Sequence, residues 1–184
     1  MSEKSHVPQT IDRPHHPETG EVTPSTLRAV LGRFATGVVV VTVGGERVHG
    51  MTANAFGSVS LEPPLVHCCV AHSAVMHGAL SLTGRFGVSV MAADQEPLAR
   101  YFADKSRPLG QAQFDVVDWV PGPHTGAPLL SGALAWLECE VSTVHVAGDH
   151  SLFLGRVLAT SHTEDDGALL FYRGGFHQVA PRAV

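Results

Sequence analysis

A run of small and hydroxylated residues between Gly50 and Ser60 is the part of the sequence whose residue types best suit ligand binding. Thr52, Asn54 and Ser58 can offer hydrogen bonds, and the glycines and alanines between them let a flat ligand approach the backbone. A planar ring that carries carbonyl groups is the kind of molecule that such a surface would bind. Small residues also suit a tight crossing of strands, so a purely structural role remains open.

Familiar catalytic and metal-binding motifs are missing from the chain. It has no GxGxxG after a strand, no GxxxxGK[ST] and no GxSxG, the patterns of common dinucleotide, phosphate and acyl-transfer sites. The 12 histidines show neither HExxH nor zinc-finger spacing, so we expect no metal. Cys68, Cys69 and Cys139 form no CxxC pair, and we expect all three to be reduced, buried thiols.

Three short helices are expected. The first begins at Pro24 after the N-cap Thr23 and ends at Gly37. Its apolar face is formed by residues three and four positions apart, namely Leu27, Val30, Leu31 and Phe34. A second helix spans about 74–82, and a third begins with Asp94 as its N-cap.

The rest of the chain is dominated by strand signals. The β-branched run 38–43, the glycine pair 44–45 and the residues from Arg47 onward predict a β-hairpin. Further strands are expected at 65–70, 86–91, 133–146, 151–163 and 169–172. These strands and their hairpin-like links predict a mainly β fold, an antiparallel barrel with a few peripheral helices. Residues 104–128 form the longest irregular stretch, and we expect a functional loop there.

Length and charge restrict the remaining possibilities. The 184 residues fit one domain, with residues 1–21 as a mobile N-terminal leader and residues 22–184 as the barrel domain. The net charge of -5 and the lack of a basic block exclude a nucleic-acid-binding surface. The apolar runs are far shorter than the roughly 20 residues of a membrane span, and the N-terminus is unlike a signal peptide. We therefore expect a cytoplasmic protein without membrane contact.

Several segments occur in the order and at the spacing of the flavin reductase family, which the chain resembles from about Pro24 to Val179. The strongest matches are residues 31–42 (LGRFATGVVVVT), 50–56 (GMTANAF) and 58–66 (SVSLEPPLV), with weaker ones at 84–86, 126–130, 134–139, 148–150 and 172–176. The resemblance implies an FMN-binding split barrel, assembled as a homodimer, that reduces FMN or FAD with NADH or NADPH. It also implies a partner, the monooxygenase of a two-component system, which receives the reduced flavin.

The resemblance further implies roles for individual residues. The flavin ring would be flanked by Thr52, Ala53, Asn54, Ala55, Phe56, Ser58 and Val59. The flavin phosphate would contact Ser73, Lys105 and Ser106. His150 matches the family histidine beside the nicotinamide, and we expect it to orient that ring as the main catalytic residue. The pyridine nucleotide would also be bordered by Phe171, Tyr172, Arg173 and Gly174.

Other interpretations of these residues stay open. Lys105 also suits a solvated loop charge, His150 a surface pair with Asp149, and Arg173 an ion pair with a surface carboxylate. A flavin-binding electron carrier or flavin store without turnover is the alternative function. A scaffold barrel that only makes protein contacts is a third possibility, because fold does not dictate function.

Overall fold

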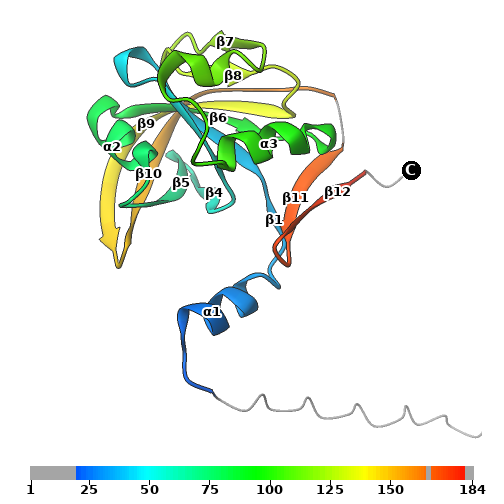
Figure 1. The fold of residues 1–184 in the computed structure, drawn as a ribbon. Coiled ribbons are helices and arrows are strands. Elements are labelled where there is room, and N and C mark those ends of the chain that lie inside the picture. The colour runs from blue at the N-terminus through cyan, green and yellow to red at the C-terminus, as the bar shows by residue number, and fades with distance from the viewer. Residues whose placement is uncertain (1–19, 165–166, 181–184) are drawn as a thin grey trace, which may run out of the picture.

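The computed structural model describes residues 20–164 and 167–180, so most of the predicted leader lies outside the described residues. The helices are α1 (Pro24–Leu31), α2 (Val75–Thr83) and α3 (Glu96–Ala103). α2 and α3 flank the strands of the barrel in Figure 1. The strands are β1 (Thr36–Gly37), β2 (Val39–Val43), β3 (His49–Ala53), β4 (Phe56–Leu61), β5 (Pro64–Ala71), β6 (Arg85–Val90), β7 (Trp119–Pro121), β8 (Pro128–Leu130), β9 (Ala135–Ala147), β10 (His150–His162), β11 (Ala168–Tyr172) and β12 (Gly175–Val179).

The main sheet has seven strands in the order β3-β2-β6-β9-β10-β5-β4, all paired antiparallel. β3 and β4 stand at opposite ends of this order, yet only Asn54 and Ala55 separate them in the chain. Neighbouring strands lie about 4.8 Å apart, so two residues cannot span a flat sheet of this width. The sheet must curl until its ends meet at Asn54 and Ala55, and the predicted antiparallel barrel is confirmed.

β2 is buried along its whole length because it separates two hydrophobic cores. Its alternate side chains point to opposite faces. Val39, Val41 and Val43 pack into a core that α2 completes, while Val38 and Val40 pack into a second core beneath α3. The β-branched run that predicted this strand is therefore apolar at nearly every position because both faces are covered.

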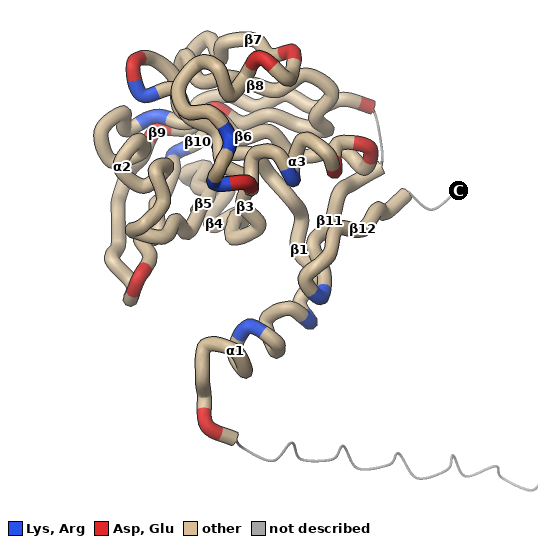
Figure 2. The backbone as a smooth tube through the Cα atoms, viewed as in Figure 1, with Lys and Arg blue, Asp and Glu red and all other residues tan. Residues whose placement is uncertain are grey.

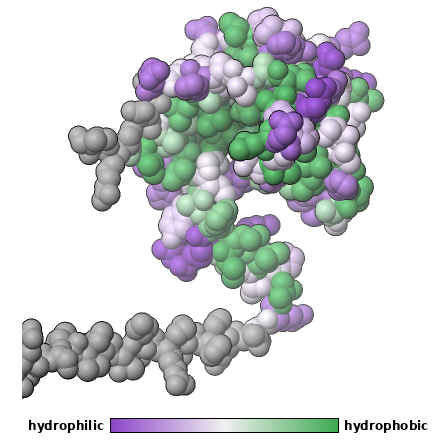
Figure 3. Space-filling model, turned by 180° about the vertical axis from the view of Figure 1, so that it is seen from behind, coloured by the Kyte–Doolittle hydropathy of each residue, from purple (hydrophilic) through white to green (hydrophobic). Residues whose placement is uncertain are grey.

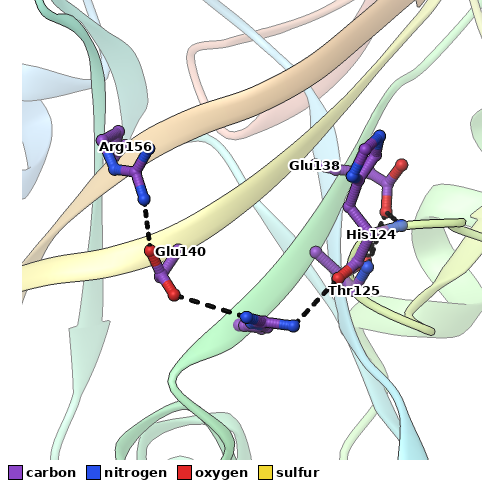
Figure 4. A network of polar contacts seen from close by, with 6 residues as sticks. His124, Thr125, Glu138, Glu140 and Arg156 are labelled. Carbon is purple, nitrogen blue, oxygen red and sulfur yellow. Dashed lines mark hydrogen bonds and ion pairs between the residues drawn. The ribbon is translucent and has the colours of Figure 1, made fainter.

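A polar network fastens the irregular segment before β8 to the barrel (Figure 4). The carboxylate of Glu138 on β9 is only 3% exposed, and its Oε2 accepts hydrogen bonds from the backbone N–H groups of His124 and Thr125 and from the Thr125 hydroxyl, at 2.8–2.9 Å. These donors satisfy a buried charge that would otherwise be costly. Two residues further along β9, Glu140 pairs with Arg85 and Arg156 at 3.5 and 2.6 Å.

Two details of the predicted helices are wrong. The first helix ends at Leu31 rather than Gly37, since Gly32 caps it and residue 37 belongs to β1, which pairs with β11. The third helix is not capped by Asp94, because a 3-10 turn over Ala93–Gln95 precedes it. The Gln95 side chain instead accepts a hydrogen bond from the backbone of Ala92 and donates one to Ser131.

α1 begins at Pro24, as predicted, but the apolar face of this helix is uncovered. Thr23 forms a capping box with Thr26, and Pro24 occupies the first helical turn. Leu27, Val30, Leu31 and Phe34 are all exposed. α1 stands apart from the barrel in Figure 1, and Figure 3 shows hydrophobic surface on this projecting arm and on the body above it.

The strand predictions are confirmed at the hairpin of β2 and β3 and at β5, β6, β9, β10 and β11. The run between Gly50 and Ser60 is two strands rather than one, and the irregular stretch 104–128 contains a 3-10 helix and β7. The three cysteines are free thiols. Burial raises the pKa of Cys68 and of Cys139 to about 12, whereas Cys69 is only half-buried.

Candidate functional site

A cavity of about 410 Å³ lies where the barrel closes. Its walls come from β3, the connection to β4, the end of β5, the first turn of α2, the loop after α3 and the first residue of β10. This volume is within the usual range for small-molecule sites, roughly 300 to 1,000 Å³. The predicted site residues that line it are Thr52, Ala53, Asn54, Ala55, Ser73, Lys105 and His150.

The other predicted site residues do not line this cavity in a single chain. Phe56, Ser58 and Val59 lie on β4, where a register shift occurs between Ser58 and Ser60. Ser106 lies next to the cavity residue Lys105. The remaining four lie on β11 and its turn, next to the end of α1, and they are Phe171, Tyr172, Arg173 and Gly174.

β3 presents backbone groups to the cavity because it has a partner strand on one side only. The Gly50 N–H donates to Gln113 Oε1 at 2.8 Å and the Gly50 carbonyl accepts from Arg107, so both groups point away from β2. Backbone directions repeat every two residues in an antiparallel strand. The N–H and C=O of Thr52 therefore also point away from β2, where a ligand could pair with them.

The Thr52 hydroxyl already makes one hydrogen bond within the protein. Its hydroxyl donates to the carbonyl of Ala99 in α3 at 2.7 Å. A hydroxyl has one proton and two lone pairs, so Thr52 Oγ1 can accept a hydrogen bond from a ligand but has no second proton to donate. Asn54 is exposed in the adjoining connection and carries both a donor and an acceptor.

The charge of the cavity is positive. Lys105 and Arg107 are among its lining residues, and no carboxylate is. Figure 2 shows basic and acidic positions next to one another along the loop after α3. In a chain with a net charge of -5, a recess lined by cations concentrates anionic ligands. Phosphate-bearing molecules are therefore the ligands that this recess favours.

Arg107 and His49 form a contact that holds the loop against β3. Arg107 donates to His49 Nε2 at 3.2 Å and also to the backbone carbonyls of Gly50 and Asp104. Arginine can only donate, so Nε2 accepts and the neutral imidazole carries its proton on Nδ1. Burial, together with the charge of Arg107, lowers the pKa of His49 from 6.5 to about 4.

Ser106 is occupied by a local turn. Its backbone N–H and its hydroxyl both donate to Asp104 Oδ1 at 2.8 Å. These hydrogen bonds lower the pKa of Asp104. Lys105 is thereby held in a short, ordered loop, while the hydroxyl proton of Ser106 is directed away from any ligand.

His150 stands at the start of β10, immediately after the turn at Gly148. Its Nδ1 lies 2.7 Å from Asp149 Oδ1, and the hydrogen bond lowers the pKa of that carboxyl. An ionised carboxylate can only accept, so it holds the imidazole proton on Nδ1. The Nε2 side of the ring is left to face other groups at the cavity.

Eleven of the eighteen cavity residues were not predicted as site residues, among them His49, Cys69, Phe102 and Arg107. Cys69 could have been recognised from the alternation of β5, in which Cys68 points into the core and its neighbour points out. His49 and Arg107 are 58 residues apart and belong to no local motif. Only the folded loop brings them together.

Residues 20–164 and 167–180 include no group of three or more histidine, cysteine, aspartate or glutamate side chains placed to hold a metal ion. No helix in that part of the chain has the length and apolar character needed to cross a bilayer.

Known proteins are similar to this chain over most of its length. The model of the flavin reductase like domain matches residues 31–180. An NADH-dependent FAD reductase of Streptomyces globisporus is 53% identical over 157 residues, which cover 85% of this chain and 86% of the relative. The reductase subunit HsaB of a flavin-dependent monooxygenase from Rhodococcus jostii is 35% identical over 161 residues, which cover 87% of this chain and 80% of HsaB.

A solved structure also matches closely. It is the crystal structure of BorF, the flavin reductase component of a bacterial two-component tryptophan halogenase. The two chains are 49% identical and superpose with a TM-score of 0.84. The match covers 87% of this chain and all of BorF.

Proposed function

The chain belongs to the family of the flavin reductase like domain, and from this membership we propose how its cavity serves flavin reduction. It is an NAD(P)H-dependent flavin reductase, which reduces FMN or FAD and supplies the reduced flavin to a partner monooxygenase. We propose that the flavin is a diffusible substrate that binds in the cavity where the barrel closes. The positive charge of that cavity, without a carboxylate in its wall, is the observation that carries this proposal.

The residues around the cavity fit a flavin phosphate ester. Lys105 and Arg107 would balance the phosphate charge, with Ser73 in the turn before α2 as a hydroxyl donor. The Thr52 backbone N–H and the Asn54 amide would bond the ring carbonyls. Bound flavin would supply the acceptor for a hydride from the nicotinamide. The protein's own contribution is to bind, to neutralise charge and to orient the two rings.

Consumption of NADH with and without added flavin tests this proposal. A flavin reductase oxidises many equivalents of NADH for each protein chain, and only when FMN or FAD is present. A flavin store or electron carrier would retain its flavin and would stop after one equivalent. Absence of flavin-dependent turnover with both NADH and NADPH would contradict the proposal.

Replacing Asn54 with leucine should weaken flavin binding about tenfold, because the change removes a polar group from the ring site while keeping similar bulk. Loss of a hydrogen bond to a buried ligand carbonyl costs about 1–2 kcal/mol. Fluorescence titration with FMN measures the effect. Ser161→Leu, at an exposed position on β10 away from the cavity, is the matched control. Equal titrations for Asn54→Leu and wild type would place the ring elsewhere.

We propose that the chain works as a homodimer and that α1 is part of the interface. The uncovered side chains of Val30, Leu31 and Phe34 form an apolar face on an arm that stands apart from the barrel. A second copy could cover this face and gain roughly 25 cal/mol for each Å² removed from water. The Arg173 N–H donates to Gly32 at the end of this arm. The turn at Arg173 would then approach the partner's cavity, as the family resemblance requires of Phe171–Gly174.

The double variant Val30→Glu, Leu31→Glu should therefore be monomeric and should bind FMN at least tenfold more weakly than wild type. Charges at the centre of an apolar interface oppose association because they lose their hydration. Light scattering reports the mass, and flavin titration reports the affinity. Val116→Glu, at an exposed apolar position outside α1, serves as control. A monomeric variant with full flavin affinity would show that the site needs only one chain.

The partner would be a flavin-dependent oxygenase. HsaB is the reductase subunit of a monooxygenase, and BorF is the reductase component of a halogenase, so either class is compatible with this chain. We also propose a cytoplasmic location, where thiols such as the half-buried Cys69 stay reduced.

A further inference from the structure

Three polar side chains meet behind the start of β10, outside the cavity. The Nε2 atoms of His72 and His77 lie 3.1 and 2.9 Å from the hydroxyl oxygen of Ser151. Each residue comes from a different part of the fold: His72 from the turn after β5, His77 from α2 and Ser151 from the second position of β10. None of the three lines the cavity where the barrel closes, so none is placed to touch a ligand there.

The hydroxyl of Ser151 sets the protons of both imidazoles. It makes no third hydrogen bond within the described part of the chain. A hydroxyl has one proton and two lone pairs, so it donates to one Nε2 atom and accepts from the other. When both rings are neutral, one therefore carries its proton on Nδ1 and the other carries it on Nε2. This three-residue network is directional, unlike an apolar contact.

Ser151 is the first buried residue of β10, with 1% of its surface exposed. Beyond it lie His150 and the exposed turn of Gly148 and Asp149. Residues 142–147 of the paired strand β9 are all exposed, so β9 contributes no buried side chain to this end of the hairpin. Backbone pairing with β5, a hydrogen bond from the His72 N–H to the Asp149 carbonyl at 2.9 Å and the Ser151 network join it to the body of the protein.

Stability alone does not require a serine at this position. Its surroundings are apolar, since Val70 lies opposite on β5 and the His77 ring packs edge-on against Phe153 at 5.3 Å. A buried hydroxyl costs free energy unless it is hydrogen-bonded, and apolar groups of the same shape in place of hydrogen-bonded partners can be nearly neutral. A fully satisfied buried network instead fixes one geometry. The network therefore sets the start of β10 against α2 more closely than apolar packing would.

We propose that Ser151, held by His72 and His77, is a positioning residue that sets the place of His150 in the cavity. This inference rests on the proposed function and on the expected role of His150 in orienting the nicotinamide. His150 and Ser151 are consecutive, so a displacement of Ser151 moves the backbone of His150 directly. Neighbouring residues of a strand point to opposite faces. The network thus holds the strand from behind, while the His150 ring lies at the cavity.

A double-mutant cycle tests this proposal. Ser151→Ala removes the shared hydroxyl and should slow flavin reduction by NADH about tenfold, with the Kd for FMN within twofold of wild type. In the His150→Ala background the same change should slow reduction less than twofold further, because a residue that acts through His150 has no effect once that ring is absent. Stopped-flow reduction and fluorescence titration measure the rate and the Kd.

Ser142→Ala is the matched control. It removes a serine hydrogen bond from the same hairpin, the one from Ser142 to the Leu154 carbonyl at 3.1 Å, and it should keep the wild-type rate and Kd.

A pair of variants at His77 applies if Ser151→Ala fails to fold. His77→Leu removes one hydrogen bond to Ser151 and keeps apolar bulk against Phe153. It should slow reduction three- to tenfold. The amide of His77→Gln can replace the lost hydrogen bond, so this variant should recover at least half of the wild-type rate. Equal rates for the two variants would overturn the proposal, because the hydrogen bond would then have no effect.

Three results of the cycle would also overturn it. Equal slowing by Ser151→Ala with and without His150 would show that the network acts independently of that ring. Weaker FMN binding with an unchanged reduction rate would mean that the network positions Ser73, the neighbour of His72, instead. A wild-type rate in Ser151→Ala would leave the hydroxyl without a role. Failure of the wild-type protein to oxidise NADH in the presence of flavin would instead contradict the proposed function.

Discussion

Replacing His150 with alanine is expected to slow flavin reduction by NADH about 100-fold while flavin affinity stays within twofold of wild type. His150 borders the proposed flavin cavity. Asp149 holds its ring through a hydrogen bond of 2.7 Å between Nδ1 of His150 and Oδ1 of Asp149. A ring held in one orientation can position the nicotinamide, and a misplacement of about 1 Å between reacting groups can cost 100-fold in rate. In the proposed site, flavin contacts would come mainly from β3 and the loop after α3, so the substitution should spare them.

Stopped-flow reduction and fluorescence titration on the same variant separate these two effects. His145→Ala is the control, because this exposed histidine lies on β9 close to the same hairpin but does not line the cavity. It should retain wild-type rates. Wild-type reduction in His150→Ala, combined with lost flavin affinity, would mean that His150 holds the flavin rather than the nicotinamide.

Acid should destabilise the fold through His49, by about 3 kcal/mol between pH 6.5 and pH 4. The pKa of this histidine falls from 6.5 to about 4 on folding because its side chain is buried beside Arg107. The unfolded chain therefore takes up a proton in this pH range that the folded chain does not. Stability conferred by a neutral buried histidine is present above pH 6.5 and decreases as the pH falls toward 4. Each pKa unit corresponds to about 1.4 kcal/mol.

Urea unfolding of wild type and His49→Gln at a series of pH values measures this contribution. Glutamine can accept the hydrogen bond from Arg107 but does not titrate. We expect the free energy of unfolding of the variant to depend less on pH across this range, whatever its absolute value. Parallel curves for the two proteins would show that His49 titrates alike in the folded and unfolded states.

The strands and hairpins could be predicted because their signals are local. The run of β-branched residues in β2 and the glycine pair after it specify a hairpin, and Gly45 adopts a positive φ of 71° there. β12 and the division between β3 and β4 were missed. Asn54-Ala55 is not a usual two-residue turn, because its geometry is fixed by the closure of the barrel.

Helix ends were predicted less well because tertiary contacts decide them. Gly37 is a residue of the type that often ends a helix, but residues 36 and 37 belong to a strand because β1 pairs with β11. Asp94 is a good N-cap by type, yet the side chain of Gln95 bonds to Ala92 and Ser131 and places a 3-10 turn first. The preference of single residue types for helix ends is weak compared with such tertiary contacts.

The candidate site was predictable where it lies on continuous segments. The residues from Thr52 to Ala55 line the cavity as a block, because a strand and its connection present them together. His49 and Arg107 could not be predicted, since the loop after α3 joins them across 58 residues. The four residues Phe171–Gly174 stay a prediction, because their placement near a cavity depends on a second chain.

The two-residue connection between β3 and β4 has a consequence for the engineering of this barrel. Asn54 and Ala55 join strands that are otherwise the free edges of the sheet, and the same two residues line the proposed flavin cavity. New chain termini placed between them by circular permutation would reopen the barrel into a curved sheet and put two charged chain ends in the binding site. A permuted chain that keeps flavin binding must therefore be cut elsewhere, at an exposed turn that does not line the cavity, such as the one at Gly132.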